Sequence, residues 1–310
     1  MKESRKIYLS GGNSYVITLP KRWVENNGLK SGDYVTVEDY GEYLVVRAKE
    51  IKRAKRVVNI DAKSLTHDSL IRRIVAHYLA GYDTIRVRIY NEEQRRAISL
   101  ASDMLVGAEV IEDLGREIVV EIFVDHRFSL EHIIEKIGRM CVTMISDFKQ
   151  LLKSLDGYIY SSIVMRENEI DRLHFLALRL LKSEINKNPK DLLEFRTVVR
   201  ALERIGDHCA KMSESLVKLK MPIPKMIELV DTLEDVLKLT LKAFLKKSTE
   251  VAEKVIDEVE RFYSVEEKFS SLVFEFSGDK SANLRILLDS LSRIAGYCSD
   301  IAESVINMCT

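Results

Sequence analysis

The sequence predicts a multidomain protein with a small β-rich head, an α+β connector and a long all-α region. Residues 1–50 alternate apolar and polar side chains between glycine-containing turns, a pattern typical of short strands. Residues 56–125 mix the two-residue period of strands with the 3.6-residue period of helices, and from residue 129 onward the helical period is nearly continuous. A chain of 310 residues also exceeds the usual size of a single domain.

The connector, residues 51–127, is predicted to contain four strands and two helices. The expected strands are Val57–Asp61, Thr84–Tyr90, Ala108–Glu112 and Glu117–Val124, and the expected helices are Asp68–Leu79 and Glu92–Val106. Its histidines are isolated in the sequence, and no group of residues in this segment forms a catalytic pattern. We therefore expect a connecting domain here and not an enzyme.

The helical region, residues 128–310, contains an internal repeat. Shifting the sequence by 89 positions, from residue 202 to residue 291, brings identical residues into register. Leu202, Arg204, Ile205, Cys209, Glu214 and Ser215 recur as Leu291, Arg293, Ile294, Cys298, Glu303 and Ser304. Helical duplicates of this size are structural units, so we expect repeats at about 128–220 and 221–310, each burying its apolar stripe in its own small bundle. Pro222 and Pro224 resist helix formation at the seam between the repeats.

The first repeat carries two pairs of acidic residues. Glu167 and Asp171 are four residues apart, as are Glu203 and Asp207, so each pair projects from one face of its helix. Two such helices packed antiparallel would direct all four carboxylates into one space. Like charges cannot be held together there unless a cation or hydrogen bonds compensate them. Hard oxygen ligands favour a divalent or trivalent ion of iron, zinc, manganese or magnesium over copper.

The surroundings of these pairs distinguish them from other acidic residues. The same spacing at Glu253/Asp257 is interpreted as a solvated helix face, whereas Glu203 and Asp207 border an apolar stripe. Gly206 lies inside the predicted helix, where glycine costs about 1 kcal/mol relative to alanine, which is understandable if another backbone approaches closely there.

His174 shares the helix face of Glu167 and Asp171. It could complete the metal sphere or cap the apolar face between bundle helices, and both interpretations stay open.

The second repeat lacks most of this chemistry. Ser292 and Gly296 stand at the positions of Glu203 and Asp207, and Ile256 stands at that of Glu167. Only Glu260, at the position of Asp171, keeps a carboxylate. We therefore predict that the second repeat is structural and holds no matching metal site.

The run LERIGDHCAKMSE, residues 202–214, resembles the signature of the PhoU family of phosphate-uptake regulators. The resemblance covers about residues 129–310 and is strong in the first repeat and degenerate in the second. It implies two three-helix bundles, acidic E/DxxxD motifs that hold metal clusters, and negative control of phosphate import and its sensor kinase. Carried over to this sequence, it implies metal ligands at Glu167, Asp171, Glu203 and Asp207. It also implies a phosphate ABC transporter ATPase subunit and a sensor kinase as partners.

The head resembles a second family. The run KIYLSGGNSYVITLPKRWVENNGLKSGDYVTVEDYGEYLVV, which begins at Lys6, is similar to the AbrB/SpoVT pattern of strand, Leu-Pro-Lys, short helix, Leu-Lys-x-Gly-Asp and hairpin. That resemblance implies that two chains swap hairpins to form one small barrel, whose basic residues bind DNA. About fifty residues bury little core alone, so a homodimer is a natural remedy. The middle segment resembles archaeal-type PhoU proteins that carry such a head.

Four basic side chains of the head are candidates for DNA contacts: Arg5, Lys6, Lys21 and Arg22. The alternative is a dimerisation and scaffold barrel that has kept the fold and lost its DNA target. The formal net charge of zero offers no global attraction for nucleic acid, so a DNA-binding surface must be local.

The sequence also predicts the cellular compartment. The four cysteines show no CxxC spacing and fall on apolar stripes, which indicates reduced thiols. No apolar run is long enough to span a bilayer, and the N-terminus lacks a signal-peptide core. We expect a cytoplasmic protein without membrane insertion.

The combined expectation is a homodimeric, metal-binding regulator of phosphate uptake and phosphate homeostasis that is not an enzyme. One alternative is a carboxylate-bridged di-iron helical-bundle oxidoreductase, which needs two Glu-x-x-His-type motifs, whereas this chain offers only Asp171-Arg172-Leu173-His174. The other is a scaffold without metal, in which arginines neutralise the carboxylates. The arginines available for this are Arg166, Arg172, Arg200 and Arg204.

Overall fold

The computed structural model describes residues 3–39, 41, 43–48, 55–124, 129–183 and 188–310. The chain divides into two compact units, Met1–Lys55 and Arg56–Thr310. The predicted domain boundaries near residues 50 and 127 lie outside the described residues.

The N-terminal unit contains two separate two-stranded antiparallel sheets. Strand β1 (Ile7–Ser10) pairs with β2 (Ser14–Ile17), and β3 (Val35–Asp39) pairs with β4 (Leu44–Ala48), with helix α1 (Lys21–Asn26) between the two hairpins. None of the described residues of this unit is buried. The described part of a single chain therefore forms the two hairpins but closes no barrel around a core.

The connector forms a four-stranded sheet in the order β5-β6-β8-β7. Strand β5 (Val57–Asp61) runs parallel to β6 (Thr84–Arg88), whereas β8 (Glu117–Ile122) runs antiparallel to both β6 and β7 (Ala108–Asp113). Helices α2 (His67–Leu79) and α3 (Glu92–Met104) complete the domain. All four strands and both helices predicted for this segment are present, with ends that differ by at most two residues.

The core of the connector follows the strand period of two residues. On β6, Ile85 and Val87 are fully buried, whereas Arg86 and Arg88 between and beyond them are exposed. The buried side chains pack with those of the two helices, including Ile74 and Ile98, in one hydrophobic cluster. One face of the sheet is therefore closed by α2 and α3, and the other carries charged side chains.

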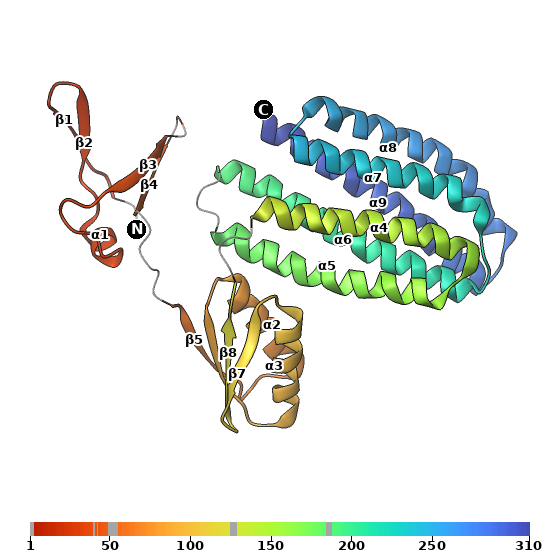
Figure 1. The fold of residues 1–310 in the computed structure, drawn as a ribbon, viewed down its shortest axis with the longest axis horizontal. Helices are drawn as coiled ribbons and strands as arrows, with labels where there is room; N and C mark the ends of the chain where they lie inside the picture. The colour runs from red at the N-terminus through yellow and green to blue at the C-terminus, as the bar shows by residue number, and fades with distance from the viewer. Residues whose placement is uncertain (1–2, 40, 42, 49–54, 125–128, 184–187) are drawn as a thin grey trace. The chain divides into compact units, whose positions relative to one another are not determined.

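The described residues from 130 to 309 (184–187 excluded) contain helices α4 (Leu130–Ser154), α5 (Gly157–Ser183), α6 (Pro189–Leu219), α7 (Ile227–Lys246), α8 (Thr249–Ser270) and α9 (Asp279–Cys309), shown in Figure 1. Short 3-10 turns at Pro224–Met226 and Ser271–Glu275 lead into α7 and follow α8. Helices α4 to α6 pack on one another, as do α7 to α9, which gives the two predicted three-helix bundles.

The two bundles share a core, which the sequence analysis did not predict. Helix α6 packs extensively along α9, and α4 packs along α7. The buried apolar side chains of α4 to α9 consequently form a single hydrophobic cluster. The expectation that each repeat buries its apolar stripe separately is therefore wrong, because each repeat has a second apolar face that needs the other repeat to cover it.

Arg179 of α5 ties the connector to the helical region. Its side chain is almost buried, and Nη1 donates to the carbonyl oxygens of Tyr78 and Tyr82 at 2.5 and 3.0 Å. Nη2 lies 3.5 Å from a carboxylate oxygen of Asp83, and the guanidinium carbon lies 4.9 Å from the centre of the Tyr78 ring. One cation thus satisfies the backbone oxygens around the end of α2.

We predict that Arg179→Met destabilises the protein, because two carbonyl oxygens lose a charged donor, at a cost of roughly 1–3 kcal/mol. Urea unfolding would measure this loss. The matched control is Arg261→Met, since Arg261 is exposed and, among the described residues, pairs only with Glu258 on its own helix. An exposed pair of this kind contributes about 0–1 kcal/mol. Equal effects of the two substitutions would contradict the role assigned to Arg179.

Candidate functional site

Helices α5 and α6 run antiparallel and bring the two acidic pairs of the first repeat to the same interface (Figure 1). Ile170, between Glu167 and Asp171, packs against Gly206, which precedes Asp207. A Cβ atom added at Gly206 would lie 3.1 Å from Cδ1 of Ile170 and 3.3 Å from its Cγ2. The close approach expected at Gly206 is therefore real, but it is made by a side chain and not by another backbone.

Three of the predicted ligands come together. Glu167, Asp171 and Asp207 each offer one carboxylate oxygen, and these oxygens all lie within 4.8 Å of one another. All three side chains are half-buried. We call these residues the carboxylate cluster. Because metal–oxygen bonds are about 2.0–2.6 Å long, one ion could reach all three oxygens with small side-chain movements.

The electrostatics of the cluster are unfavourable without a cation. Burial, followed by the neighbouring charges of Glu167, Asp207 and Glu203, raises the pKa of Asp171 to about 7. Burial, followed by the charge of Asp207, also raises the pKa of Glu167. The cluster thus consists of half-buried acids that repel one another, which is the condition that a bound cation relieves.

Glu203 lies beside the carboxylate cluster without belonging to it. Its Oε2 is buried and has no hydrogen-bond partner among the described residues. Burial and the charge of Asp207 raise the pKa of its carboxyl, and the charges of Arg200 and Arg204 oppose that rise. A buried carboxylate oxygen without a hydrogen bond beside three other carboxylate oxygens makes a donor set that fits a hard cation.

The arginines of the scaffold alternative divide into two groups. Arg166 lies 2.5 Å from Asp147 and Arg172 lies 3.1 Å from Glu169, so both pair with carboxylates outside the cluster. Arg204 reaches Asp207 at 3.2 Å, but its Nε and that of Arg200 are 3.7 and 3.9 Å from Oε2 of Glu203. Among the described residues, arginines therefore pair with Asp207 and Glu203 but not with Glu167 or Asp171.

His174 is buried and does not belong to the carboxylate cluster. Only 5% of the residue is exposed, and its ring meets Phe175 edge-on at 5.9 Å between centroids. Burial lowers the pKa of its imidazole to about 4, so the ring is neutral at physiological pH. Its Nδ1 has no hydrogen-bond partner among the described residues. Its role as a ligand stays a prediction.

The second repeat has different side chains at the corresponding interface. The hydroxyl of Ser292 donates to Glu266 at 2.7 Å, and the hydroxyl of Tyr263 donates to the carbonyl of Ser292 at 3.3 Å. The same tyrosine oxygen lies 3.5 Å from the position of a Cβ at Gly296. Tyr263 thus lies beside Ser292 and Gly296, the positions equivalent to Glu203 and Asp207. The described part of the second repeat contains no group of three possible metal ligands.

The four predicted DNA-binding residues are exposed. Arg5 contacts Glu3, and Nζ of Lys21 lies 3.7 Å from Glu25. Lys6 and Arg22 have no ion pair within the described part of the head. Two of the four basic side chains therefore form an ion pair with a nearby glutamate, and the other two have no ion-pair partner in the described part of the head.

Sequence reasoning missed Arg179, although a signal for it exists. It is the single charged residue in the run from Phe175 to Leu181. A cation inside an apolar helical run requires an acceptor, and here the acceptors belong to the connector.

No helix among the described residues is both long enough and apolar enough to cross a membrane.

The comparisons with known proteins agree with this architecture. Residues 134–216 and 226–305 each match the family model for the PhoU domain, and residues 8–54 match the model named "Antidote-toxin recognition MazE, bacterial antitoxin". The expected AbrB-like head is confirmed as a MazE/AbrB-like antitoxin domain. No curated protein matches the chain in sequence.

Two solved structures share the fold of the helical region. The crystal structure of PhoU from Pseudomonas aeruginosa is 18% identical at a TM-score of 0.50, over 58% of this chain and 95% of that one. The phosphate transport system regulatory protein PhoU from Streptococcus pneumoniae is 16% identical at a TM-score of 0.50, over 58% and 93%. The two PhoU-domain matches span just over half of the 310 residues, and the chain therefore belongs to the PhoU family.

Proposed function

We propose that this protein regulates phosphate transport, with a metal ion in the first helical repeat and a dimeric N-terminal head that binds DNA. The observation that carries the proposal is the carboxylate cluster: three half-buried carboxylate oxygens within 4.8 Å of one another, in a domain of the PhoU family. Membership of the PhoU family and the likeness to the phosphate transport system regulatory protein of Streptococcus pneumoniae support regulation of phosphate transport. We infer a regulatory role and no catalytic one.

The metal would be held by Glu167, Asp171 and Asp207, with the unsatisfied Oε2 of Glu203 as a further ligand. When bound, the ion supplies positive charge to a group of repelling acids. The two helices contribute ligands to the same ion, so its presence would favour the antiparallel packing of α5 on α6. Iron, zinc, manganese and magnesium all accept such oxygen ligands.

A homodimer is supported by the apolar surface of the head. Ile7, Leu9 and Leu44 are 65%, 62% and 61% exposed, and β1 to β4 carry further exposed apolar side chains. Apolar surface on this scale marks an interaction site. A second copy of the head, exchanging hairpins with the first, would cover these side chains and bring both sets of basic residues together around a two-fold axis.

DNA is the proposed target of those basic residues, in keeping with the MazE/AbrB-like domain. A dimer would double the set formed by Arg5, Lys6, Lys21 and Arg22, so that two half-sites of a pseudo-palindromic or shape-selected duplex could be contacted. The helical region would act on protein partners, for which a phosphate transporter ATPase subunit and a sensor kinase are the proposed candidates.

Metal binding is predicted to need both helices. The double substitution Asp171→Asn/Asp207→Asn should abolish it, since it removes one clustered ligand from α5 and one from α6. Elemental analysis of purified protein gives the stoichiometry. The control Glu253→Gln/Asp257→Asn removes the same charge from an exposed acidic pair at the same spacing and should leave the metal content unchanged. An undiminished metal content in the first variant would refute the assignment.

The metal-free protein is predicted to show a pH dependence that originates at Asp171. The folded pKa of about 7 exceeds the unfolded value near 3.8, so the folded state binds this proton more tightly. The stabilising contribution of the proton is complete below pH 3.8 and is lost as the pH rises through about 7.

Asp171→Asn should therefore stabilise the metal-free protein increasingly as the pH rises through this window, relative to wild type. Urea unfolding in the presence of a chelator measures the difference, with Asp257→Asn as control. A difference between wild type and Asp171→Asn that does not change with pH would contradict the assigned pKa.

DNA binding by the head is predicted to depend on salt. If several basic side chains contact phosphates, the log of the affinity falls with the log of the salt concentration, at a slope of about −0.9 per contact. Replacing Arg5, Lys6, Lys21 and Arg22 with alanine should flatten this slope and leave the dimer intact. Gel-shift titrations at two salt concentrations, with the promoter region of a phosphate-transport operon, provide the measurement.

The control for this test removes four cations from the helical region instead: Lys218, Lys225, Lys254 and Arg261. This control variant should bind DNA with the same affinity and salt dependence as the wild type. Weak binding that is equal for wild type and both variants would mean that the head is a dimerisation barrel without a DNA target.

A further inference from the structure

The open face of the connector sheet contains a cavity that the proposed function does not use. It has a volume of about 540 Å³, within the range of about 300–1,000 Å³ of small-molecule sites. Its walls come from strands β5 and β6 and from the turn between β7 and β8. The lining side chains on which the argument depends are Asn59, Asp61, Arg86, Arg88, Leu114 and Arg116.

Strand register brings these side chains to one face. Arg86 and Arg88 are two residues apart on β6 and alternate with the buried Ile85 and Val87, so both point away from the helices. On the neighbouring strand, Asn59 stands opposite Arg86 and Asp61 stands opposite Arg88. Arg116 comes from the adjoining turn. The sheet therefore directs three guanidinium groups into one cavity.

The three guanidinium groups of the cavity have no bonded side-chain partner among the described residues. Arg86, Arg88 and Arg116 form no side-chain hydrogen bond or ion pair with any residue in the described part of the chain. Asp61 is occupied elsewhere: its Oδ1 accepts from the backbone N–H of Lys63 at 2.9 Å, and its Oδ2 accepts from the hydroxyl of Tyr90 at 3.4 Å. Glu117 is the other carboxylate in the lining. Positive charge therefore exceeds negative charge in the cavity.

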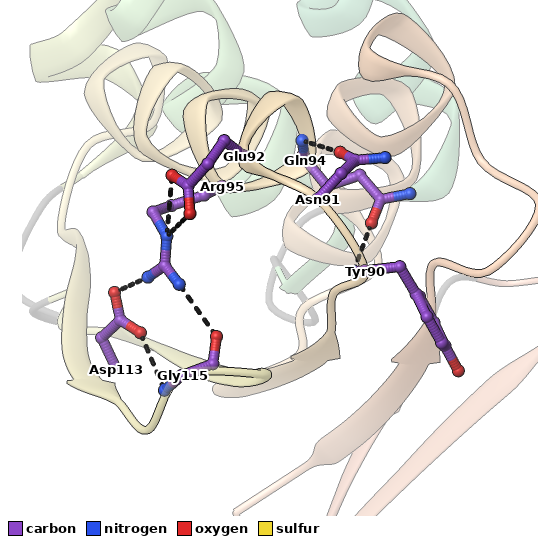
Figure 2. A network of polar contacts seen from close by, with 7 residues as sticks. All are labelled: Tyr90, Asn91, Glu92, Gln94, Arg95, Asp113 and Gly115. Atoms are coloured by element: carbon purple, nitrogen blue, oxygen red, sulfur yellow. Dashed lines mark hydrogen bonds and ion pairs between the residues drawn. The ribbon is translucent and has the colours of Figure 1, made fainter.

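A polar network holds the turn that carries Leu114 and Arg116 in place (Figure 2). Arg95 of α3 contacts the carboxylate of Asp113, and its Nη2 donates to the carbonyl oxygen of Gly115 at 2.8 Å. The backbone N–H of Gly115 donates to Asp113 at 3.3 Å, which closes the turn on itself. Leu114 and Arg116 thus stand on a turn tied to a helix, so one wall of the cavity is preorganised.

We propose that this cavity binds a small ligand with a diphosphate group, such as a nucleoside diphosphate. Arginine suits this chemistry, because its planar guanidinium group donates to phosphate oxygens in pairs. The exposed side chains of Leu114 and Asn59 offer an apolar surface and an amide to the remainder of the ligand. The site lies on the connector and shares no residue with the carboxylate cluster.

Isothermal titration calorimetry of the full chain tests this, with ADP and inorganic pyrophosphate as probes. We expect saturable binding to one site per chain. Arg86→Gln/Arg88→Gln should weaken binding about tenfold or more, because charged hydrogen bonds to the ligand are lost. Arg73→Gln/Arg96→Gln is the control, since it removes the same charge from exposed positions of α2 and α3. Circular dichroism would verify that each variant is folded.

The two probes separate the possible sources of the diphosphate group. Tighter binding of ADP would indicate that the Leu114 and Asn59 side chains contact the nucleoside, and equal binding would indicate recognition of the diphosphate alone. Asp171→Asn/Asp207→Asn should bind both probes like the wild type, which separates this site from the metal site.

Three results would overturn the proposal. The first is the absence of binding of either probe to the wild type. The second is an equal loss of affinity in the Arg86/Arg88 variant and in its control. The third is a loss of duplex DNA binding, in place of small-ligand binding, when the connector arginines are changed.

Discussion

The site depends on a conflict between apolar packing and charge repulsion at the α5–α6 interface. Ile170 packs on Gly206, and Leu202 and Ile205 are fully buried beside them. This packing holds Glu167, Asp171 and Asp207 near one another although their charges repel. The hydrophobic core therefore fixes the geometry of the acids, and a cation would remove the repulsion without a change of fold.

The two repeats keep the same core and differ in chemistry. Cys209 and Cys298 occupy equivalent positions and are both fully buried, and α6 and α9 pack together along the seam between the bundles. Where the first repeat has Asp207 and Glu203, the second has Gly296 and Ser292 beside Tyr263. Both repeats thus keep the apolar residues that the shared core requires, while among the described residues the first repeat alone gathers three acids, the group proposed to hold a metal ion. The same first repeat also carries Arg179, so α5 joins the acidic site to the connector.

Local pattern was enough to predict the elements but not the contacts between them. The strand and helix limits of the connector, the break before α7, and the proximity of three of the four predicted acids all follow from periodicity, prolines and spacing. Four features depend on tertiary neighbours, and the sequence predicted them incompletely or not at all. Sequence spacing could not show that Glu203 lies outside the cluster, that Ile170 fills the space at Gly206, or that the bundles merge into one core. The acceptors of Arg179 lie about a hundred residues away in the sequence, which no local pattern reveals.

The most direct test of the central claim is anomalous diffraction from crystals of the full chain grown with Mn²⁺. The account predicts an anomalous peak within coordination distance of Glu167, Asp171 and Asp207, with no corresponding peak beside Ser292 and Gly296. A peak bound at Glu260 in the second repeat, or an empty carboxylate cluster at saturating Mn²⁺, would contradict it.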